Sequence, residues 1–162
     1  PREFKLTPTQ SQTVRFALRR KANAQDGEYR SYLVVDCSID NPQKEGETNL
    51  SLQTRLVHNI PIIVRSGKLD AQLDIDNILI ENDSVHFTLN RQGTRSVYGE
   101  IEVINTTNND TVSMSRSISI YPETKQHQFK LPIKGINPQN LKIRFTEDKD
   151  FGGSIIFEKN IQ

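Results

Sequence analysis

The sequence has a single cysteine, no long apolar run and almost no excess of charge. Because Cys37 is the only cysteine among 162 residues, the chain can form neither an internal disulfide nor a thiolate metal cluster. No apolar run approaches the length of a membrane-spanning helix. Lysine and arginine total 21 against 20 aspartate and glutamate residues, which gives no indication of a polyanionic partner. A lone cysteine does not specify the redox compartment.

Motifs of common catalytic and metal sites are missing as well. His58, His86 and His127 lie on separate expected strands without the spacing of a metal site. The sequence "DKDFGGS" at 148–154 lacks the acidic ligands of a calcium loop, and no GxSxG, Walker or GxGxxG pattern occurs. Basic residues do not alternate with aromatic ones as on a nucleic-acid surface. We therefore expect no enzymatic activity, no metal or other cofactor and no nucleic-acid partner.

Helical periodicity is also missing, whereas short alternating runs rich in valine, isoleucine, phenylalanine and threonine recur between turn residues. This pattern predicts an all-β chain. Beyond Gly67 the candidate strands lie near 69–75, 77–80, 85–90, 97–105, 112–121, 127–133, 141–146 and 154–158. Their number and spacing are typical of an immunoglobulin-like β-sandwich. We predict that residues 67–162 form one such domain, and that the polar stretch around "RSGKLDAQ" is the interdomain linker.

Residues 1–66 have fewer candidate strands, which lie around 14–18, 29–37 and 50–64. So few strands cannot close two sheets over a core, and an apolar face is expected to stay open unless another element covers it. In "QDGEYRSYLVV", an Asp-Gly turn precedes Tyr29, which is the pattern of the tyrosine corner at the start of strand F. Strand G, the last of its domain, is then the 50–64 run.

This last stretch, "NLSLQTRLVHNIPIIVRSG" at 49–67, is long for a strand. Its apolar side chains alternate over residues 50–64, which predicts one apolar face. Strands usually run about five or six residues, so either the stretch contains a turn or the strand extends beyond its own sheet. A further alternative is that residues 50–56 simply face their own domain.

Several segments in order resemble the PapD-like periplasmic chaperones of the chaperone–usher pilus pathway, most closely the archaic, Csu-type branch. They are "LTPTQSQTVRF", "DGEYRSYLVV", "LSLQTRLVHNIPIIVR", "RQGTRSVYGEI" and "DFGGSIIFEKN", and together they cover essentially the whole chain. The resemblance implies a periplasmic chaperone of two immunoglobulin-like domains, which binds pilin subunits by donor-strand complementation and delivers them to an outer-membrane usher. It also implies that residues 1–66 are the C-terminal part of the first domain, with roughly the first five strands outside this chain.

The resemblance assigns roles to particular residues. The side chains expected to enter the pilin groove are Leu50, Leu52, Thr54 and Leu56. An ion network that fixes the interdomain angle is expected from Glu28, Arg65 and Asp150. The alternative is that these three residues are separate, solvated charges on the surface.

One family feature does not carry over. The family's carboxylate-binding lysine on strand G corresponds to Pro61, which has no charge and no N–H for a ladder. A terminal-carboxylate anchor must then use another cation, and Arg30 and Arg55 are candidates because guanidinium groups match carboxylates.

Two other interpretations stay open. The chain is an immunoglobulin-like structural or adhesive module with no strand donation, or a second copy covers the open face by strand exchange as a homodimer.

Overall fold

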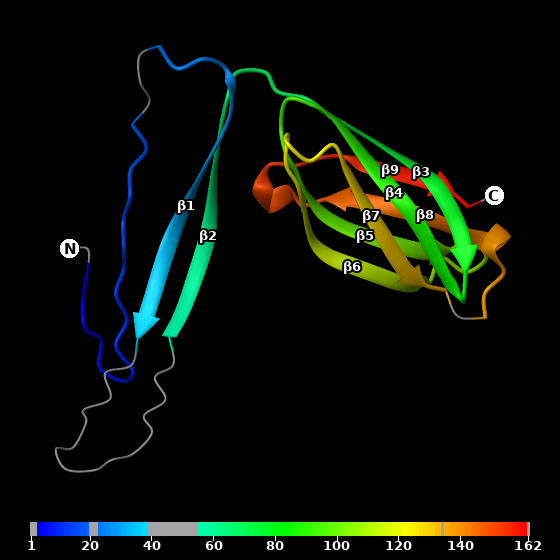
Figure 1. Cartoon of the computed structure of the whole chain (residues 1–162), viewed down its shortest axis with the longest axis horizontal. Helices are drawn as coiled ribbons and strands as arrows, with labels where there is room; N and C mark the ends of the chain where they lie inside the picture. The colour runs from blue at the N-terminus through cyan, green and yellow to red at the C-terminus, as the bar shows by residue number, and fades with distance from the viewer. Residues whose placement is uncertain (1–2, 20–22, 39–54, 134, 162) are drawn as a thin grey trace.

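A computed structural model describes residues 3–19, 23–38, 55–133 and 135–161. These residues contain nine strands and two short 3-10 helices, Pro138–Asn140 and Lys149–Phe151. Figure 1 shows two parts: a sheet of two strands, β1 and β2, and a sandwich that holds the other strands. The all-β prediction is confirmed.

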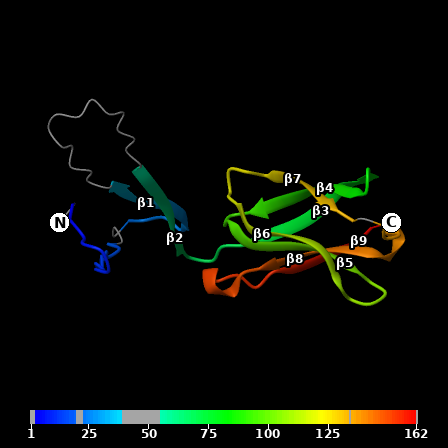
Figure 2. The same cartoon turned by 90° about the horizontal axis from the view of Figure 1, so that it is seen from below.

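The sandwich consists of two antiparallel sheets, which Figure 2 shows as separate layers. One sheet has the order β3-β4-β7, and the other has the order β6-β5-β8-β9. The strands are β3 (Ala71–Glu81), β4 (Ser84–Gly93), β5 (Val97–Asn105), β6 (Thr111–Ile120), β7 (Gln126–Pro132), β8 (Leu141–Glu147) and β9 (Ile156–Asn160). If strands β3 to β9 are lettered A to G in chain order, one sheet is A-B-E and the other is D-C-F-G. This is an immunoglobulin-like arrangement in which the fourth strand joins the C-F-G sheet.

The core of the sandwich follows from the alternation of its strands. In β8 every second residue is buried, and Leu141, Ile143 and Phe145 are fully buried. They pack with buried side chains of the other sheet, such as Ile75 and Leu89. Each such side chain contributes about 1.5–3 kcal/mol of apolar transfer free energy, so this core stabilises the sandwich without β1 and β2.

One strand differs from the prediction. The candidate strands near 69–75 and 77–80 form the single strand β3, with a register shift between Asp76 and Leu79. Asn77, inside this irregularity, has a positive φ of 51°. A β-bulge interrupts the alternation of a strand without ending it, which explains why the pattern suggested two strands.

The strands β1 (Gly27–Ser38) and β2 (Arg55–Ser66) form a two-stranded antiparallel sheet. Its register runs from Gly27 opposite Ser66 to Ser38 opposite Arg55. The Tyr29 hydroxyl donates a hydrogen bond of 2.6 Å to the Gln25 carbonyl oxygen. This is the geometry of the tyrosine corner that the Asp-Gly-x-Tyr pattern predicted.

The strand expected around Val14, Phe16 and Leu18 is not formed. Residues 10–19 contain no strand, and these three side chains are exposed. Alternation predicts which side chains share a face, but a strand also needs a neighbour for its backbone groups. Within the described residues, β1 and β2 pair only with each other.

Candidate partner-binding sheet and its junction with the sandwich

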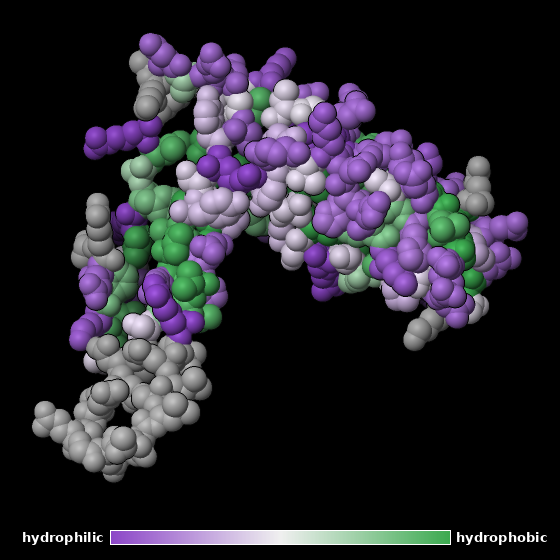
Figure 3. Space-filling view, in the orientation of Figure 1, coloured by the Kyte–Doolittle hydropathy of each residue, from purple (hydrophilic) through white to green (hydrophobic). Residues whose placement is uncertain are grey.

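The two-stranded sheet exposes apolar side chains on both strands. Since successive residues of a strand point to opposite faces, one face carries residues such as Leu33, Val35, Leu56 and Ile60. Leu56 is 55% exposed and Ile60 is 48% exposed. Figure 3 shows green, apolar surface along this part of the molecule. Contiguous exposed apolar surface of this kind is typical of an interaction site.

Exposure changes along β2 in one direction. Residues from Arg55 to Pro61 are exposed, and residues from Ile62 to Ser66 are half-buried. The half-buried end lies at the junction with the sandwich, and the other end projects away from it (Figure 1). The strand is therefore held at one end and open at the other.

Of the four side chains expected to enter a pilin groove, the structure places one. Leu56 lies on β2, opposite Cys37 of β1. Leu50, Leu52 and Thr54 lie outside the described residues. Cys37 is exposed and carries a free thiol.

Both candidate carboxylate anchors are paired with carboxylates of the chain itself. Arg55 Nε donates a 2.7 Å hydrogen bond to Asp36 Oδ1, and Arg55 Nη2 contacts the other oxygen of the same carboxylate. The hydrogen bond from Arg55 lowers the pKa of Asp36, and the same bond raises the pKa of Arg55. The second candidate, Arg30, reaches the sandwich. Its guanidinium lies 3.9 Å from the centre of the Tyr121 ring and 3.4 Å from the Glu123 carboxylate.

The main contact between the sheet and the sandwich is made by the Glu28 carboxylate. Its side chain is only 3% exposed. One oxygen, Oε2, accepts hydrogen bonds from Ser96 N at 2.9 Å, Ser96 Oγ at 2.8 Å and Arg65 Nε at 3.0 Å. Hydrogen bonds to an ionised acceptor are stronger than neutral ones, and a nearly buried carboxylate needs such partners.

Arg65 completes this junction, but Asp150 does not take part in it. The Arg65 guanidinium donates to the Phe151 carbonyl oxygen at 3.0 Å and to the Ser96 carbonyl oxygen at 3.1 Å. Asp150 appears in none of the ion pairs between described residues, and its backbone N–H donates a 2.9 Å hydrogen bond to Asp148 Oδ1. The structure thus brings together Glu28 and Arg65 of the expected ion network, and a backbone carbonyl stands where Asp150 was expected.

Ser96 belongs to a turn that is also hydrogen bonded to the linker. Asp70 accepts hydrogen bonds on its carbonyl oxygen from Thr94 N and Arg95 N, at 2.9 and 3.1 Å. Gly93 in the same turn has a φ of 102°, and a Cβ there would lie 2.5 Å from the Asp70 carbonyl oxygen. We call residues 93–96 the junction turn, because it contacts the linker, β1 and β2. Sequence reasoning missed Ser96, since a single serine in a turn has no distinguishing pattern.

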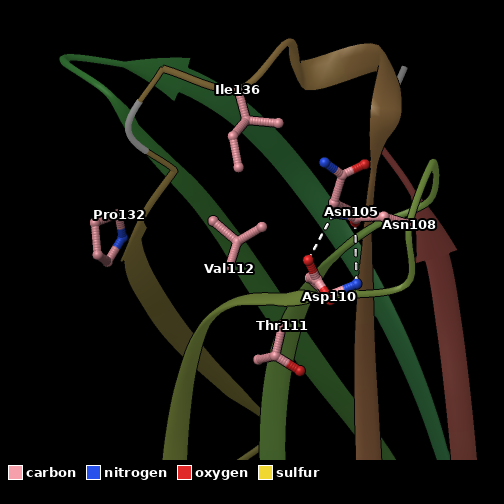
Figure 4. Close-up of a pocket in the computed structure, with 7 residues that line it drawn as sticks. All are labelled: Asn105, Asn108, Asp110, Thr111, Val112, Pro132 and Ile136. Carbon is pink, nitrogen blue, oxygen red and sulfur yellow. Dashed lines mark hydrogen bonds between the residues drawn. The ribbon is translucent and has the colours of Figure 1, made fainter.

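A second candidate site is an open hollow of about 490 Å³ between the loops that follow β5 and β7. Figure 4 shows Val112, Pro132 and Ile136 on one side of it and polar side chains on the other. Asn108 and Asp110 are hydrogen bonded to each other within their own loop, at 2.6 and 3.1 Å. The polar groups are therefore already partnered, and the hollow gives no indication of a ligand.

In the described part of the chain, no three histidine, cysteine, aspartate or glutamate residues are grouped so that they could hold a metal ion. None of the described helices is long and apolar enough to cross a membrane. Comparisons with protein-family models, curated proteins and solved structures found no match.

Proposed function

We propose that the chain is a pilus-assembly chaperone of the periplasm, which binds pilin subunits by adding β2 to their incomplete sheet and delivers them to an outer-membrane usher. The observation that carries this proposal is that β2 exposes apolar side chains and is anchored at only one end. It is a long strand that exposes Leu56 and Ile60 on one face and Val57 on the other, and it is held at one end by the junction. The order of the sequence segments that resemble PapD-like chaperones supports the choice of partner.

Strand addition uses two properties of an open strand. Unpaired backbone N–H and C=O groups give affinity, and alternate side chains give fit. Leu56 and Ile60 share one face of β2, and filling a partner's groove with both contributes about 1.5–3 kcal/mol of apolar transfer free energy for each. Pro61 marks the inner limit of the pairing, since a partner strand receives no hydrogen bond from it.

The paired states of Arg30 and Arg55 bear on the terminal-carboxylate anchor. A pilin carboxylate that binds either guanidinium has to displace Glu123 or Asp36 of the chaperone. Glu123 is 69% exposed and its two contacts with Arg30 are 3.4 Å long, so it is the easier carboxylate to replace. Arg30 is therefore the better anchor in this proposal.

Coexpression with a pilin subunit from the same source tests the function. The variant Leu56→Asp with Ile60→Asp places two charges on the face that would enter the pilin, and we expect it to abolish capture. The matched control is Leu79→Asp with Ile156→Asp, which alters similarly exposed apolar side chains of the sandwich. Capture that survives the first pair would contradict the proposal. The molecular mass of the unmixed chain in solution shows whether a second copy occupies the open edge instead.

A further inference from the structure

We propose that the buried Arg95–Glu147 ion pair, which lies wholly within the sandwich, is a positioning element for the β1–β2 sheet. It joins the two sandwich segments that hold this sheet, and so fixes the direction in which β2 projects. The inference concerns the orientation of the sheet, and it holds whether or not the partner is a pilin.

The pair ties two segments together through one carboxylate. The Glu147 side chain is 2% exposed, and Arg95 contacts both of its oxygens, with a distance of 3.1 Å between Nη2 and Oε2. Oε2 also accepts the backbone N–H groups of Ser154 and Ile155, at 3.0 and 3.1 Å. Arg95 belongs to the junction turn. Glu147 therefore connects this turn to the loop of residues 148–155.

The space around the carboxylate is closed. A Cβ at Gly153 would lie 2.1 Å from Glu147 Cγ, so the loop approaches the glutamate as closely as a glycine permits. The loop also bonds to β5, because Asp148 N donates to the Tyr98 carbonyl oxygen at 2.8 Å. Its position is thus fixed relative to the junction turn.

Both segments contact the two-stranded sheet. The junction turn supplies Ser96, which donates two hydrogen bonds to Glu28. The loop supplies the Phe151 carbonyl oxygen to Arg65, whose guanidinium also bonds to the Ser96 carbonyl oxygen. Arg65 can make both bonds only while the turn and the loop keep their present separation. Arg95 and Glu147 help to set that separation, together with the backbone bond from Asp148 to Tyr98.

The other buried arginine of this region has a different role. Arg91 donates to the carbonyl oxygens of Gly93 and Arg95, at 3.0 and 2.7 Å. It also reaches the Pro122 carbonyl oxygen, but no hydrogen bond of the structure joins it to the loop of residues 148–155. Arg91 therefore holds the turn to the segment that follows β6, whereas Glu147 holds the turn to the loop.

The orientation can be measured with two spin labels, in a Cys37→Ser background that removes the native thiol. Labels on cysteines at Asn59 of β2 and Glu81 of β3 report the distance distribution between sheet and sandwich, since both positions are exposed. We expect Glu147→Gln to widen this distribution at least twofold, because the neutral side chain no longer holds Arg95. Amide exchange of Ile101, in the sandwich core, verifies in the same sample that the sandwich is folded.

Glu158→Gln is the matched control. Glu158 also pairs with two cations, Lys142 and Arg144, but it touches neither the turn nor the loop. We expect its distance distribution to equal that of the wild type. If Glu147→Gln lowers the core protection, Arg95→Lys replaces it, since lysine keeps the charge but loses the two-pronged contact. A wild-type distribution in the folded Glu147→Gln or Arg95→Lys variant would overturn the proposal and leave the pair a stabilising role alone.

Discussion

Removing the Glu28 side chain tests the junction at a single atom. In Glu28→Ala, the backbone N–H of Ser96 loses the carboxylate oxygen that accepts it at 2.9 Å. Ser96 is 2% exposed, so water does not readily replace this acceptor. The other donors have alternatives, because the Ser96 hydroxyl can rotate and Arg65 keeps two carbonyl partners. The main loss is therefore one buried donor left unsatisfied.

The size of this loss can be worked out. A buried donor without a partner costs about 1–3 kcal/mol, and a hydrogen bond to a charged group contributes a similar amount. Since about 1.4 kcal/mol corresponds to a factor of ten in an equilibrium constant, local opening at Ser96 should become about 5- to 150-fold more frequent. Glu28→Gln keeps an oxygen available to Ser96, and its effect should be less than about tenfold.

Amide hydrogen exchange of Ser96, measured by NMR against Ile101 as an internal reference, gives the frequency of local opening at Ser96 directly. Glu123→Ala is the control, since Glu123 also joins the sheet to the sandwich but is 69% exposed. Exposed ion pairs contribute about 0–1 kcal/mol, so Ser96 exchange should not change in the control by more than about fivefold. Equal Ser96 protection in Glu28→Ala and the wild type would refute the assignment of this contact.

Two further predictions concern neighbouring residues. Burial alone raises the pKa of Glu147, but hydrogen bonds from Arg95 and the N–H groups of Ile155 and Ser154 outweigh it and hold this pKa below the ordinary value of 4.5. A carboxyl group with a lowered folded-state pKa contributes stability that is present above the unfolded value and is lost as the pH falls through the folded one. The Tm of the sandwich should thus decrease as the pH is lowered below 4.5. Glu147→Gln should make the Tm depend less on pH in this range. A pH dependence of the Tm that is the same in this variant and the wild type would contradict the role of this carboxylate. In Gly67→Ala, the new Cβ would lie 2.2 Å from Asp26 Cγ at a φ of 79°, so the linker must move. Small-angle X-ray scattering should detect a changed orientation of the sheet, whereas Gly27→Ala, which has open space for a Cβ, should match the wild type.

The sequence predicted those parts of the fold that depend on local pattern. The alternation of Leu141, Ile143 and Phe145 marks one buried face, and the structure buries all three. The Asp-Gly turn before Tyr29 predicted a tyrosine corner, and the hydrogen bond to Gln25 is present. The prediction of a strand around Phe16 was wrong, because alternation carries no information about whether a neighbouring strand exists.

The junction could be predicted only in part. Glu28 and Arg65 were expected to interact, and the structure places them 3.0 Å apart. The choice between Asp150 and the Phe151 carbonyl depends on the conformation of a short 3-10 helix, in which Asp148 caps the Asp150 N–H. Ser96 lies 68 residues from Glu28 along the chain, and no local pattern indicates a contact over that separation.

The position of these contacts has a consequence for strand donation. A donated strand must keep its edge and its apolar side chains exposed, and yet point in a defined direction, because flexibility of the strand lowers affinity through lost conformational entropy. Between the residues that the structure describes, every hydrogen bond that holds β2 to the sandwich comes from Arg65, while Arg55 to Pro61 remain exposed. An anchor at one end fixes the direction without covering the edge. If donation is the function, loosening the junction should therefore slow capture and leave the contacts of the bound strand unchanged, whereas changes at Leu56 should weaken those contacts themselves.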